Sequence, residues 1–369
     1  MNIWKIHQLL QDLVELLSFV PRKIVQISLV FGIAVFITIA GYNIPASVAV
    51  SKDSSTYRTF TDWCLNKETL QPSTKDIVNE MLRKTATSDC KEASLKLSEF
   101  RSFGLPGSKI VDIRPLKFMT NLTEIGFDNN QISDISPLKF LTKLQYVSLH
   151  NNVISDISPL MSSTNLSELY LSNNKISDLS SLKSLTNLHE LDLRYNQISD
   201  LSPLMSLSNL GKLYLSNNQI VRINPLKSIT KLFHLYLDNN QISDIGSLGY
   251  LTNLVELYLS NNEISDISAL GNLTKLVRLE LDNNQISDIS SLASLTNLFP
   301  QLALHNNQIV DISPLASLTQ LEAITLHNNQ IVDISPLASL TKMEAVLLMN
   351  NPIANKSCPL KSGSICRFD

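Results

Sequence analysis

Apolar and polar residues follow one pattern that repeats every 22 residues between Phe100 and Ile353. Counted from an asparagine that recurs once per repeat, large apolar residues stand at positions −8, −5, −3, +2, +5, +8 and +11. Around Asn262 these residues are Leu254, Leu257, Leu259, Ile264, Ile267, Leu270 and Leu273. The −5 and −3 positions have polar neighbours, which is the two-residue period of a strand with one buried face. One turn of chain cannot bury so many apolar groups alone, so consecutive turns are expected to stack around a shared core.

The asparagine itself comes directly after each predicted strand, where the chain turns inward. An amide side chain at this place satisfies backbone N–H and C=O groups that would otherwise be buried without partners. Stacked turns therefore predict a structural asparagine ladder. Its members are Asn130, Asn152, Asn174, Asn196, Asn218, Asn240, Asn262, Asn284, Asn307, Asn329 and Asn351.

The period and the form L-x-x-L-x-L-x-x-N are the signature of a leucine-rich-repeat solenoid. We expect an α/β fold with a curved parallel β-sheet on the concave face and short 3-10 or loop segments on the convex side. A solenoid exposes its core at both ends, so caps are required. We expect a helical N-terminal cap over residues 56–99, repeats over 100–353 and a C-terminal cap over 354–369.

Two helices are expected in the N-terminal cap. Ser73 and Asp76 have the spacing of a capping box at a helix start, and an apolar stripe follows at helical spacing. A second short helix is expected near Asp89 to Leu97.

A column of aspartates lies four residues after the asparagines, in segments of the form S-D-I-S-P-L. There Asp and Ser cap a turn, and the spacing lacks the cage of oxygen ligands that calcium needs within one loop. We therefore interpret these aspartates as turn residues rather than metal ligands; one repeat has Arg222 instead. Another repeat is one residue longer around Pro300, which is expected at the beginning of a strand or in a small bulge.

Two segments precede the caps. Residues 1–23 have the pattern of an amphipathic helix, and residues 24–49 are uncharged, mostly apolar and end in small residues. This pattern predicts either a signal peptide cut after Ala49 or a retained membrane anchor. Because Arg22 and Lys23 precede the apolar stretch, both alternatives place the repeats outside the cytoplasm.

The four cysteines lie outside the repeats, at Cys64 and Cys90 before them and at Cys358 and Cys366 after them. About eleven stacked turns, each roughly 4.8 Å thick, separate the two ends, whereas a disulfide joins Cα atoms about 4.4–6.8 Å apart. We therefore expect Cys64–Cys90 and Cys358–Cys366 bonds, and no zinc site made of all four thiolates. Disulfides are typical of exported proteins.

Repeats such as residues 133–154, of the form S-D-I-S-P-L-x-x-L-T-x-L-x-x-L-x-L-x-x-N, resemble those of bacterial internalin-type leucine-rich-repeat proteins. The resemblance covers about 250 residues and is specific for the fold. It implies recognition of proteins on the concave face, often by aromatic side chains. The cysteine-bearing flanks, around Cys64 and from Cys358 to Phe368, are similar to short exported repeat proteins of cyanobacteria.

Positions −6, −4 and −2 of each strand are expected to point onto the concave face. Tyr214, Tyr236 and Tyr258 occupy −4 in three consecutive turns, so their rings are expected to stack. Tyrosine combines an apolar ring with a polar tip, which suits a protein interface, and the same rings could stack on a glycan. The alternative is that tyrosine simply has a good strand propensity. The candidate partner-binding residues are Tyr146, Tyr170, Tyr195, Tyr214, Tyr236, Tyr258, Arg194, Arg278 and His234.

The last turns of this face differ from the middle ones. Their positions carry Ala323, Ala345, Leu347 and Met349, an apolar stretch that either meets a second copy or is covered by the C-terminal cap. His305 and His327 are also expected to be neighbours, but no third ligand accompanies them, so no metal site is predicted.

The composition and motifs narrow the function. A net charge of −3 provides no basic field for nucleic acid, and no catalytic triad, glycine-rich nucleotide loop or zinc motif is present. We expect an exported, non-catalytic protein-binding scaffold that is secreted, periplasmic or anchored to the outer side of the plasma membrane, with no cofactor. Two alternatives remain open: a structural protein of the cell envelope, and a regulatory subunit of phosphatase type, which shares the repeat but not the export signal.

Overall fold

The computed structural model describes residues 57–369 together with two short strands, β1 (Thr38–Ile39) and β2 (Tyr42–Asn43). β1 and β2 pair antiparallel within a first unit, Met1–Val50, and Ser51–Asp369 forms a second unit. The predicted amphipathic segment 1–23 lies outside the described residues, as does the predicted signal peptide or anchor 24–49 apart from β1 and β2. In the part of the chain that the structure describes, no helix is long and apolar enough to cross a membrane.

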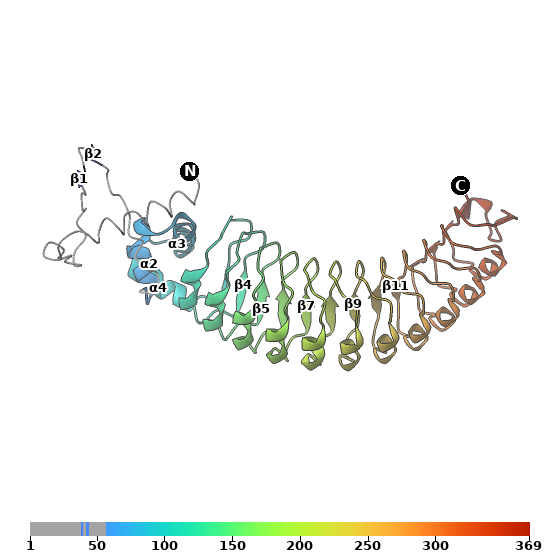
Figure 1. Ribbon diagram of the computed structural model, residues 1–369, viewed down its shortest axis with the longest axis horizontal. Coiled ribbons are helices and arrows are strands. Elements are labelled where there is room, and N and C mark those ends of the chain that lie inside the picture. Colours follow the sequence, from blue (N-terminus) through green and yellow to red (C-terminus); the bar gives the residue numbers. More distant parts are fainter. Residues whose placement is uncertain (1–37, 40–41, 44–56) are drawn as a thin grey trace. The chain divides into compact units, whose positions relative to one another are not determined.

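The second unit is a leucine-rich-repeat solenoid, which confirms the predicted fold. Between residues 57 and 369, thirteen strands form one parallel sheet in which each strand pairs with its neighbour in the chain. The turns lie side by side along an arc, and the 3-10 segments follow its outer edge (Figure 1). The strands are β3 (Ser102–Gly104), β4 (Glu124–Gly126), β5 (Tyr146–Ser148), β6 (Glu168–Tyr170), β7 (Glu190–Asp192), β8 (Lys212–Tyr214), β9 (His234–Tyr236), β10 (Glu256–Tyr258), β11 (Arg278–Glu280), β12 (Gln301–Ala303), β13 (Ala323–Thr325), β14 (Ala345–Leu347) and β15 (Cys366–Arg367).

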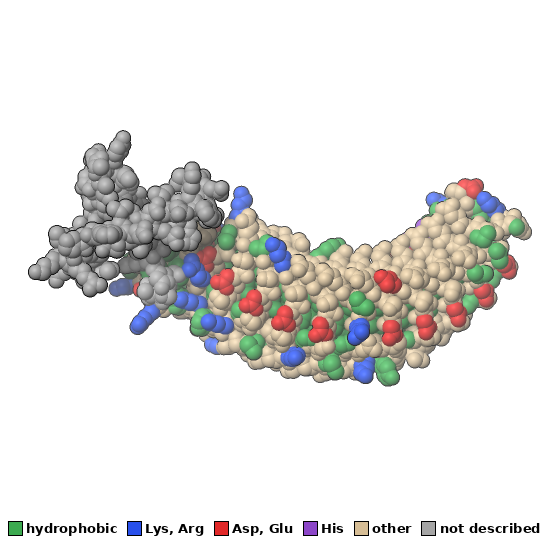
Figure 2. Space-filling model, in the orientation of Figure 1, with side chains coloured by type: hydrophobic (Ala, Val, Ile, Leu, Met, Phe, Trp, Pro, Cys, Tyr) green, Lys and Arg blue, Asp and Glu red, His purple; other side chains and the backbone are tan. Residues whose placement is uncertain are grey.

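Each strand from β4 to β13 is followed by an asparagine turn and then by a 3-10 segment that returns the chain, and the first of these segments follows β3 in the same way without the asparagine. These segments are η3 (Arg114–Phe118), η4 (Ser136–Phe140), η5 (Ser158–Ser162), η6 (Ser180–Ser184), η7 (Ser202–Ser206), η8 (Asn224–Ser228), η9 (Gly246–Tyr250), η10 (Ser268–Asn272), η11 (Ser290–Ser294), η12 (Ser313–Ser317) and η13 (Ser335–Ser339). The aspartate column starts most of them: Asp200 Oδ1, for example, accepts a hydrogen bond from the backbone N–H of Ser202 at 2.8 Å. The interpretation of these aspartates as turn residues is therefore confirmed, and acidic side chains recur at regular intervals along this side of the arc (Figure 2).

The core runs through the whole stack because equivalent apolar residues of adjacent turns lie against one another. Leu257 in β10 is in register with Leu235 in β9 and Leu279 in β11, and all three are buried. Burying one such side chain contributes roughly 1.5–3 kcal/mol before conformational entropy is subtracted. In most turns the same contribution recurs at seven positions, so the core fixes the register of the stack.

The asparagine ladder forms as predicted and joins each turn to the one before it. Asn262 donates from Nδ2 to the carbonyl oxygens of Leu237 at 3.1 Å and Leu259 at 3.0 Å, and its Oδ1 accepts from the N–H of Ile242 at 3.0 Å. The side chain thus satisfies backbone groups of two turns at once, which a buried loop requires.

The N-terminal cap contains three helices, α2 (Phe60–Leu65), α3 (Pro72–Thr85) and α4 (Cys90–Glu99), and the short 3-10 turn η2 (Lys67–Thr69). The predicted capping box at Ser73 is wrong. α3 begins at Pro72 with Gln71 as its N-cap and no side-chain cap, because proline suits the first position of a helix, where no N–H partner is needed. A capping box forms instead in α2, between Thr59 and Asp62. The second predicted helix is α4, and Asp89 caps it.

Disulfides join Cys64 to Cys90 in the N-terminal cap and Cys358 to Cys366 in the C-terminal cap, the same pairs that the sequence predicted. The C-terminal cap also contains η14 (Gly363–Ile365) and adds β15 to the sheet, next to β14. Strand β15 was not predicted. It extends the backbone pairing of the solenoid into the cap.

The longer repeat is accommodated at the beginning of β12. Pro300 directly precedes this strand, and two residue pairs join β11 to β12 where most neighbouring strands have three. Pro300 has no N–H to donate, so it lies outside the ladder but accepts from the N–H of Glu322 at 2.8 Å. The first of the two predicted alternatives is therefore correct.

Candidate functional site

The strand face, defined here as the side chains at positions −6, −4 and −2 of the turns, points away from the core. In β9, for example, Leu235 is buried whereas His234 and Tyr236 on either side of it are half-buried. The strands are rigidly spaced by their backbone ladder. A side chain at one position is therefore held close to the side chain at the same position of the next turn.

The tyrosines of the strand face form two groups. In the first group, the Tyr146 and Tyr170 ring centroids are 5.5 Å apart, and the His150 ring lies 5.4 Å from Tyr170. In the second, Tyr236 lies 4.9 Å from Tyr214 and 4.2 Å from Tyr258, with the last two rings stacked. The three consecutive tyrosines lie side by side as expected, although only Tyr236 and Tyr258 are stacked and the Tyr214 ring is tilted by 46° against Tyr236. We call these three side chains the tyrosine row.

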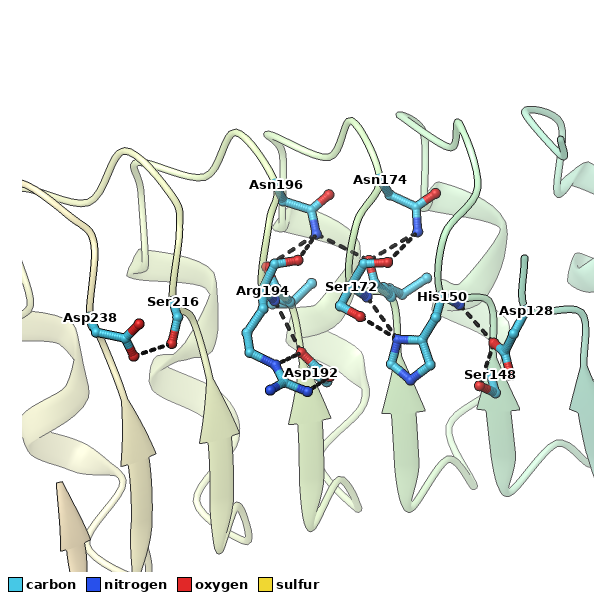
Figure 3. Close-up of polar contacts among 12 residues, drawn as sticks. Asp128, Ser148, His150, Ser172, Asn174, Asp192, Arg194, Asn196, Ser216 and Asp238 are labelled. Carbon is cyan, nitrogen blue, oxygen red and sulfur yellow. Dashed lines mark hydrogen bonds and ion pairs between the residues drawn. The ribbon is translucent and has the colours of Figure 1, made fainter. Parts of the chain in front are cut away.

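The two groups are separated by an ion pair in β7 and the turn that follows it. Asp192 takes the −4 position, where the neighbouring turns on both sides carry tyrosine, and only 1% of its surface is exposed. Arg194 donates to both of its carboxylate oxygens, at 3.0 and 2.7 Å, and the Arg194 guanidinium lies 5.1 Å from the Tyr214 ring centroid (Figure 3). The carboxylate of Asp192 raises the pKa of Arg194, so the arginine remains charged.

Glu256 links the other predicted charged residues to the tyrosine row. Its Oε2 accepts from the Tyr236 hydroxyl at 2.8 Å, and its Oε1 lies 3.9 Å from His234 Nε2 and 3.8 Å from Arg278 Nε. Burial, and then the hydrogen bond to Glu256, raise the pKa of Tyr236. The phenol is therefore neutral and fixed in orientation at physiological pH.

Tyr195 stands beside this site in an unfavourable backbone conformation. Its φ of 55° lies in the left-handed region, and the equivalent residue is asparagine in each of the other repeats from Asn129 to Asn350. Asparagine tolerates this conformation because its short side chain can hydrogen-bond locally, whereas tyrosine has no such compensation. The Tyr195 side chain is 58% exposed, so packing does not account for it. Residues held against local preference are often found at functional sites.

Hydroxyl and carboxylate side chains brace the ends of the strands. Ser148 donates to Asp128 of the preceding turn at 2.6 Å, and Ser216 donates to Asp238 of the following turn (Figure 3). Ser260 likewise donates to Asp282 of the following turn. These pairs join adjacent turns and hold their carboxylates in place. The strand face is therefore a preorganised surface, which reduces the entropy lost on binding.

One part of the surface was not predicted from the sequence. Where the chain enters each strand, four consecutive turns carry apolar residues that the backbone ladder holds side by side. They are Phe233, Val255 and Val277 at position −7, and Phe299, which takes the equivalent place at position −8 of the longer repeat. Phe233 is 38% exposed and Phe299 43%. Most other turns have a polar residue or glycine at −7, and comparison of the repeats column by column would have found this apolar edge. It borders the tyrosine row on one side.

The stacked histidines follow the tyrosine row along the same face. The His305 and His327 rings are 4.4 Å apart, as expected, and His305 Nε2 lies 3.5 Å from Asp282 Oδ2. Burial, and then the charge of His305, lower the pKa of His327. Among the described residues, no group of three or more His, Cys, Asp or Glu side chains could hold a metal ion. In the last turns, Ala323, Ala345, Leu347 and Met349 are half-buried on this face.

Comparisons with known proteins agree with this architecture. The family model described as "Leucine Rich repeats (2 copies)" matches residues 120–162, 164–206, 186–228, 208–250, 230–272, 252–294 and 301–339. A comparison with curated proteins found no match. Among solved structures, internalin InlF of Listeria monocytogenes is 34% identical, with a TM-score of 0.66, over 76% of this chain and 90% of the internalin.

Two more distant structures share the fold. The functional domain of InlJ from Listeria monocytogenes is 18% identical, with a TM-score of 0.58, over 81% of this chain and 77% of that one. The ectodomain of the Arabidopsis thaliana receptor kinase GASSHO1/SCHENGEN3, solved with CASPARIAN STRIP INTEGRITY FACTOR 2, is 22% identical, with a TM-score of 0.52, over 69% of this chain and 41% of that one. The closer resemblance of the flanks to cyanobacterial proteins stays a prediction. The chain belongs to the leucine-rich-repeat family and resembles the Listeria internalins within it.

Proposed function

We propose that this protein is an exported, non-catalytic scaffold that binds a partner protein on its strand face, centred on the tyrosine row. Leucine-rich-repeat proteins with an internalin-like fold are typically protein-binding scaffolds. The observation that carries the proposal is the tyrosine row, in which Tyr214, Tyr236 and Tyr258 lie side by side and half-buried on the strand face. Tyrosine is among the residues that contribute most to protein interfaces.

Tyr195 and the apolar edge support the same surface. Tyr195 lies next to the row in a strained conformation with its ring in solvent, and the apolar edge exposes Phe233 and Phe299 on the other side of the row. Together they give an interface centre of aromatic rings surrounded by charged residues, which is the usual anatomy of a protein-binding site.

Export is supported by the cysteines. Both disulfides close caps, and no free cysteine is present among the described residues. Disulfides of this kind persist in oxidising compartments. The repeats therefore belong outside the cytoplasm in this proposal, whether the N-terminal segment is cleaved or retained.

The test compares proteins captured by the full chain and by a variant with Tyr214→Ala, Tyr236→Ala and Tyr258→Ala. We expect a partner that binds the wild-type chain with an affinity at least ~30-fold higher than it binds the variant, because each aromatic anchor typically contributes about 1–2 kcal/mol. The affinities are measured with the purified partner.

Tyr250→Ala is the matched control. Tyr250 is 66% exposed but lies in η9, away from the strand face, so its removal should change the affinity less than about 2-fold. A triple variant that retains every protein captured by the wild type would contradict the proposal and favour a structural role in the envelope.

A further inference from the structure

Both ends of the tyrosine row have a carboxylate, but only one of these two carboxylates is paired with an arginine of the chain. Position −4 is Asp192 in the turn before Tyr214 and Glu280 in the turn after Tyr258, so a carboxylate flanks each end of the row. The strand registers pair Asp192 with Tyr214 and Tyr258 with Glu280. The row is therefore three adjacent rings between two acids.

At the first end, the protein supplies its own arginine. Arg194 forms a bidentate pair with Asp192 and lies 5.1 Å from the centroid of Tyr214. This arrangement satisfies the acid and also contacts the ring by a cation–π interaction. It is an internal example of how a guanidinium binds an acid at the end of this row.

At the second end, no base of the chain pairs with the acid. Among the described residues, the Glu280 carboxylate has no hydrogen bond and no ion pair within 4 Å, although it is half-buried. Arg278, in the same strand, lies 3.8 Å from Glu256 instead. Burial, and then the charges of Asp282 and Asp238, raise the pKa of Glu280. The charge of Arg278 has a smaller, opposing effect on this pKa, so a further cation beside Glu280 would favour the ionised carboxylate.

The space beside Glu280 is large enough for a side chain. A hollow of about 360 Å³ is lined by Tyr195, Tyr236, Tyr258, Asp238, Glu280 and Asp282 among others. A second hollow of about 530 Å³ shares Tyr258, Glu280 and Asp282 and continues toward Pro300 and the stacked histidines. The two hollows meet at the end of the tyrosine row.

The charges on the strand face between β6 and β11 also favour a cationic partner. All the bases there have acidic partners: Arg194 with Asp192, Lys212 with Glu190 at 2.9 Å, and both His234 and Arg278 with Glu256. Among the described residues, Glu168, Asp238 and Glu280 have no base within 4 Å, and Asp282 has only the His305 imidazole. Asp238, Glu280 and Asp282 line the hollows. The face thus has an excess of negative charge where its aromatic surface is accessible.

We propose that the partner protein presents an arginine whose guanidinium lies against the Tyr258 ring and pairs with Glu280, as Arg194 does with Tyr214 and Asp192 at the other end. This proposal rests on the proposed function and specifies the chemistry of the partner. Arginine fits better than lysine because a planar guanidinium stacks on a ring and forms paired hydrogen bonds to a carboxylate. The neighbouring carboxylates of Asp238 and Asp282 would accept further basic residues of the same segment.

The first test uses a synthetic peptide in which arginine and glycine alternate, with the full chain at about 0.15 M salt. Binding is followed by fluorescence anisotropy and by the NMR signals of labelled tyrosine rings, with Tyr258→Phe to assign the Tyr258 signal. We expect binding of the arginine peptide at least ~3-fold tighter than of a lysine peptide, a shift of the Tyr258 signal, and a loss of at least ~10-fold in Glu280→Gln.

Glu124→Gln is the matched control, because Glu124 is an exposed acid on the same face, in β4, far along the stack from the tyrosine row. It should reduce binding less than about 2-fold. Equal losses in Glu280→Gln and Glu124→Gln would reveal diffuse electrostatic attraction and overturn the proposal. Undiminished binding by Glu280→Gln would also overturn it.

The natural partner then separates this inference from the proposed function. The triple tyrosine variant could lose the partner while Glu280→Gln binds it as well as the wild type does. In that case the strand face is the binding site, but the proposal that a partner arginine pairs with Glu280 fails. If the triple variant keeps the partner, the proposed function itself fails. Loss in both variants, with Glu124→Gln unaffected, supports both.

Discussion

The interior and the strand face of the solenoid are built from the same turns but obey different rules. In the interior, each turn repeats the same residues with the same contacts: the Nδ2 atoms of Asn262 and Asn284 make matching bonds to three backbone carbonyls each. On the strand face, position −4 changes from Asp192 to tyrosine and then to Glu280 within five turns. The stack requires periodicity inside and permits variation outside.

The difference shows where selection for stability and selection for binding can act separately. An interior residue supports the turn before it as well as its own, so a substitution disturbs two turns. A residue on the strand face contacts mainly its neighbours on that face. Substitutions in the interior should therefore change mainly stability, and substitutions on the strand face should change mainly binding.

Asn262→Ala should cause the largest loss of stability. It removes the acceptor of the buried Ile242 N–H and leaves that group without a partner. The Leu237 and Leu259 carbonyls each lose one of two amide donors and keep their bonds to Asn240 and Asn284. The expected cost is about 1–3 kcal/mol in the free energy of unfolding. Urea unfolding followed by circular dichroism measures it.

The control for this change is another asparagine of the same repeat. Asn253 is exposed and donates to the Thr230 carbonyl at 3.0 Å, so Asn253→Ala should cost less than about 0.5 kcal/mol. Equal losses of stability in the two variants would mean that the asparagine ladder stabilises the protein no more than an exposed asparagine does. The predicted difference between the interior and the surface would then be wrong.

Tyr195→Asn should change stability in the opposite direction. It places the residue that the other repeats use at a φ of 55°, and we expect the free energy of unfolding to rise by about 1 kcal/mol. The partner should bind more weakly, since the exposed ring is lost. Asn217→Tyr, the reverse change one turn later, should cost a similar amount of stability. A Tyr195→Asn variant that is less stable than the wild type would exclude strain at this residue.

The contrast between interior and face also explains what the sequence could predict. The interior columns follow from fixed spacing, so the parallel sheet, the asparagine ladder and the aspartate turns were predictable. The side-by-side placement of Tyr214, Tyr236 and Tyr258 followed as well, because equal positions in adjacent turns become neighbours. The cap helices do not repeat, so no spacing predicts where they begin. The predicted start of α3 was wrong by two residues, because Pro72 begins the helix without a side-chain cap.

Two features of the site depended on structure that the spacing does not encode. The first is that Arg194 turns back on Asp192, since the rotamer of a long side chain is not a property of the repeat. The second is the exposure of the apolar edge around Phe233 and Phe299, which begins before each strand and so does not follow the strand's alternation. Only the structure shows that Glu280 has no base within 4 Å among the described residues.

Glu280→Gln should produce the smallest change in stability, with a characteristic pH dependence. The pKa of Glu280 is raised in the folded state by burial and by Asp282 and Asp238. A raised carboxyl pKa means that the folded state favours the protonated form, so this contribution to stability is present at low pH and is lost as pH rises through the raised pKa. The variant should therefore match the wild type below the unfolded pKa of about 4.3 and be more stable at neutral pH, by less than about 1 kcal/mol because the group is only half-buried.

Thermal unfolding at a series of pH values measures the difference, and Glu124→Gln, whose acid is exposed, serves as the reference. A variant that is more stable yet binds an arginine peptide more weakly would mean that the Glu280 carboxylate lowers stability and serves binding. A variant that is less stable at neutral pH would mean that ionised Glu280 stabilises the fold.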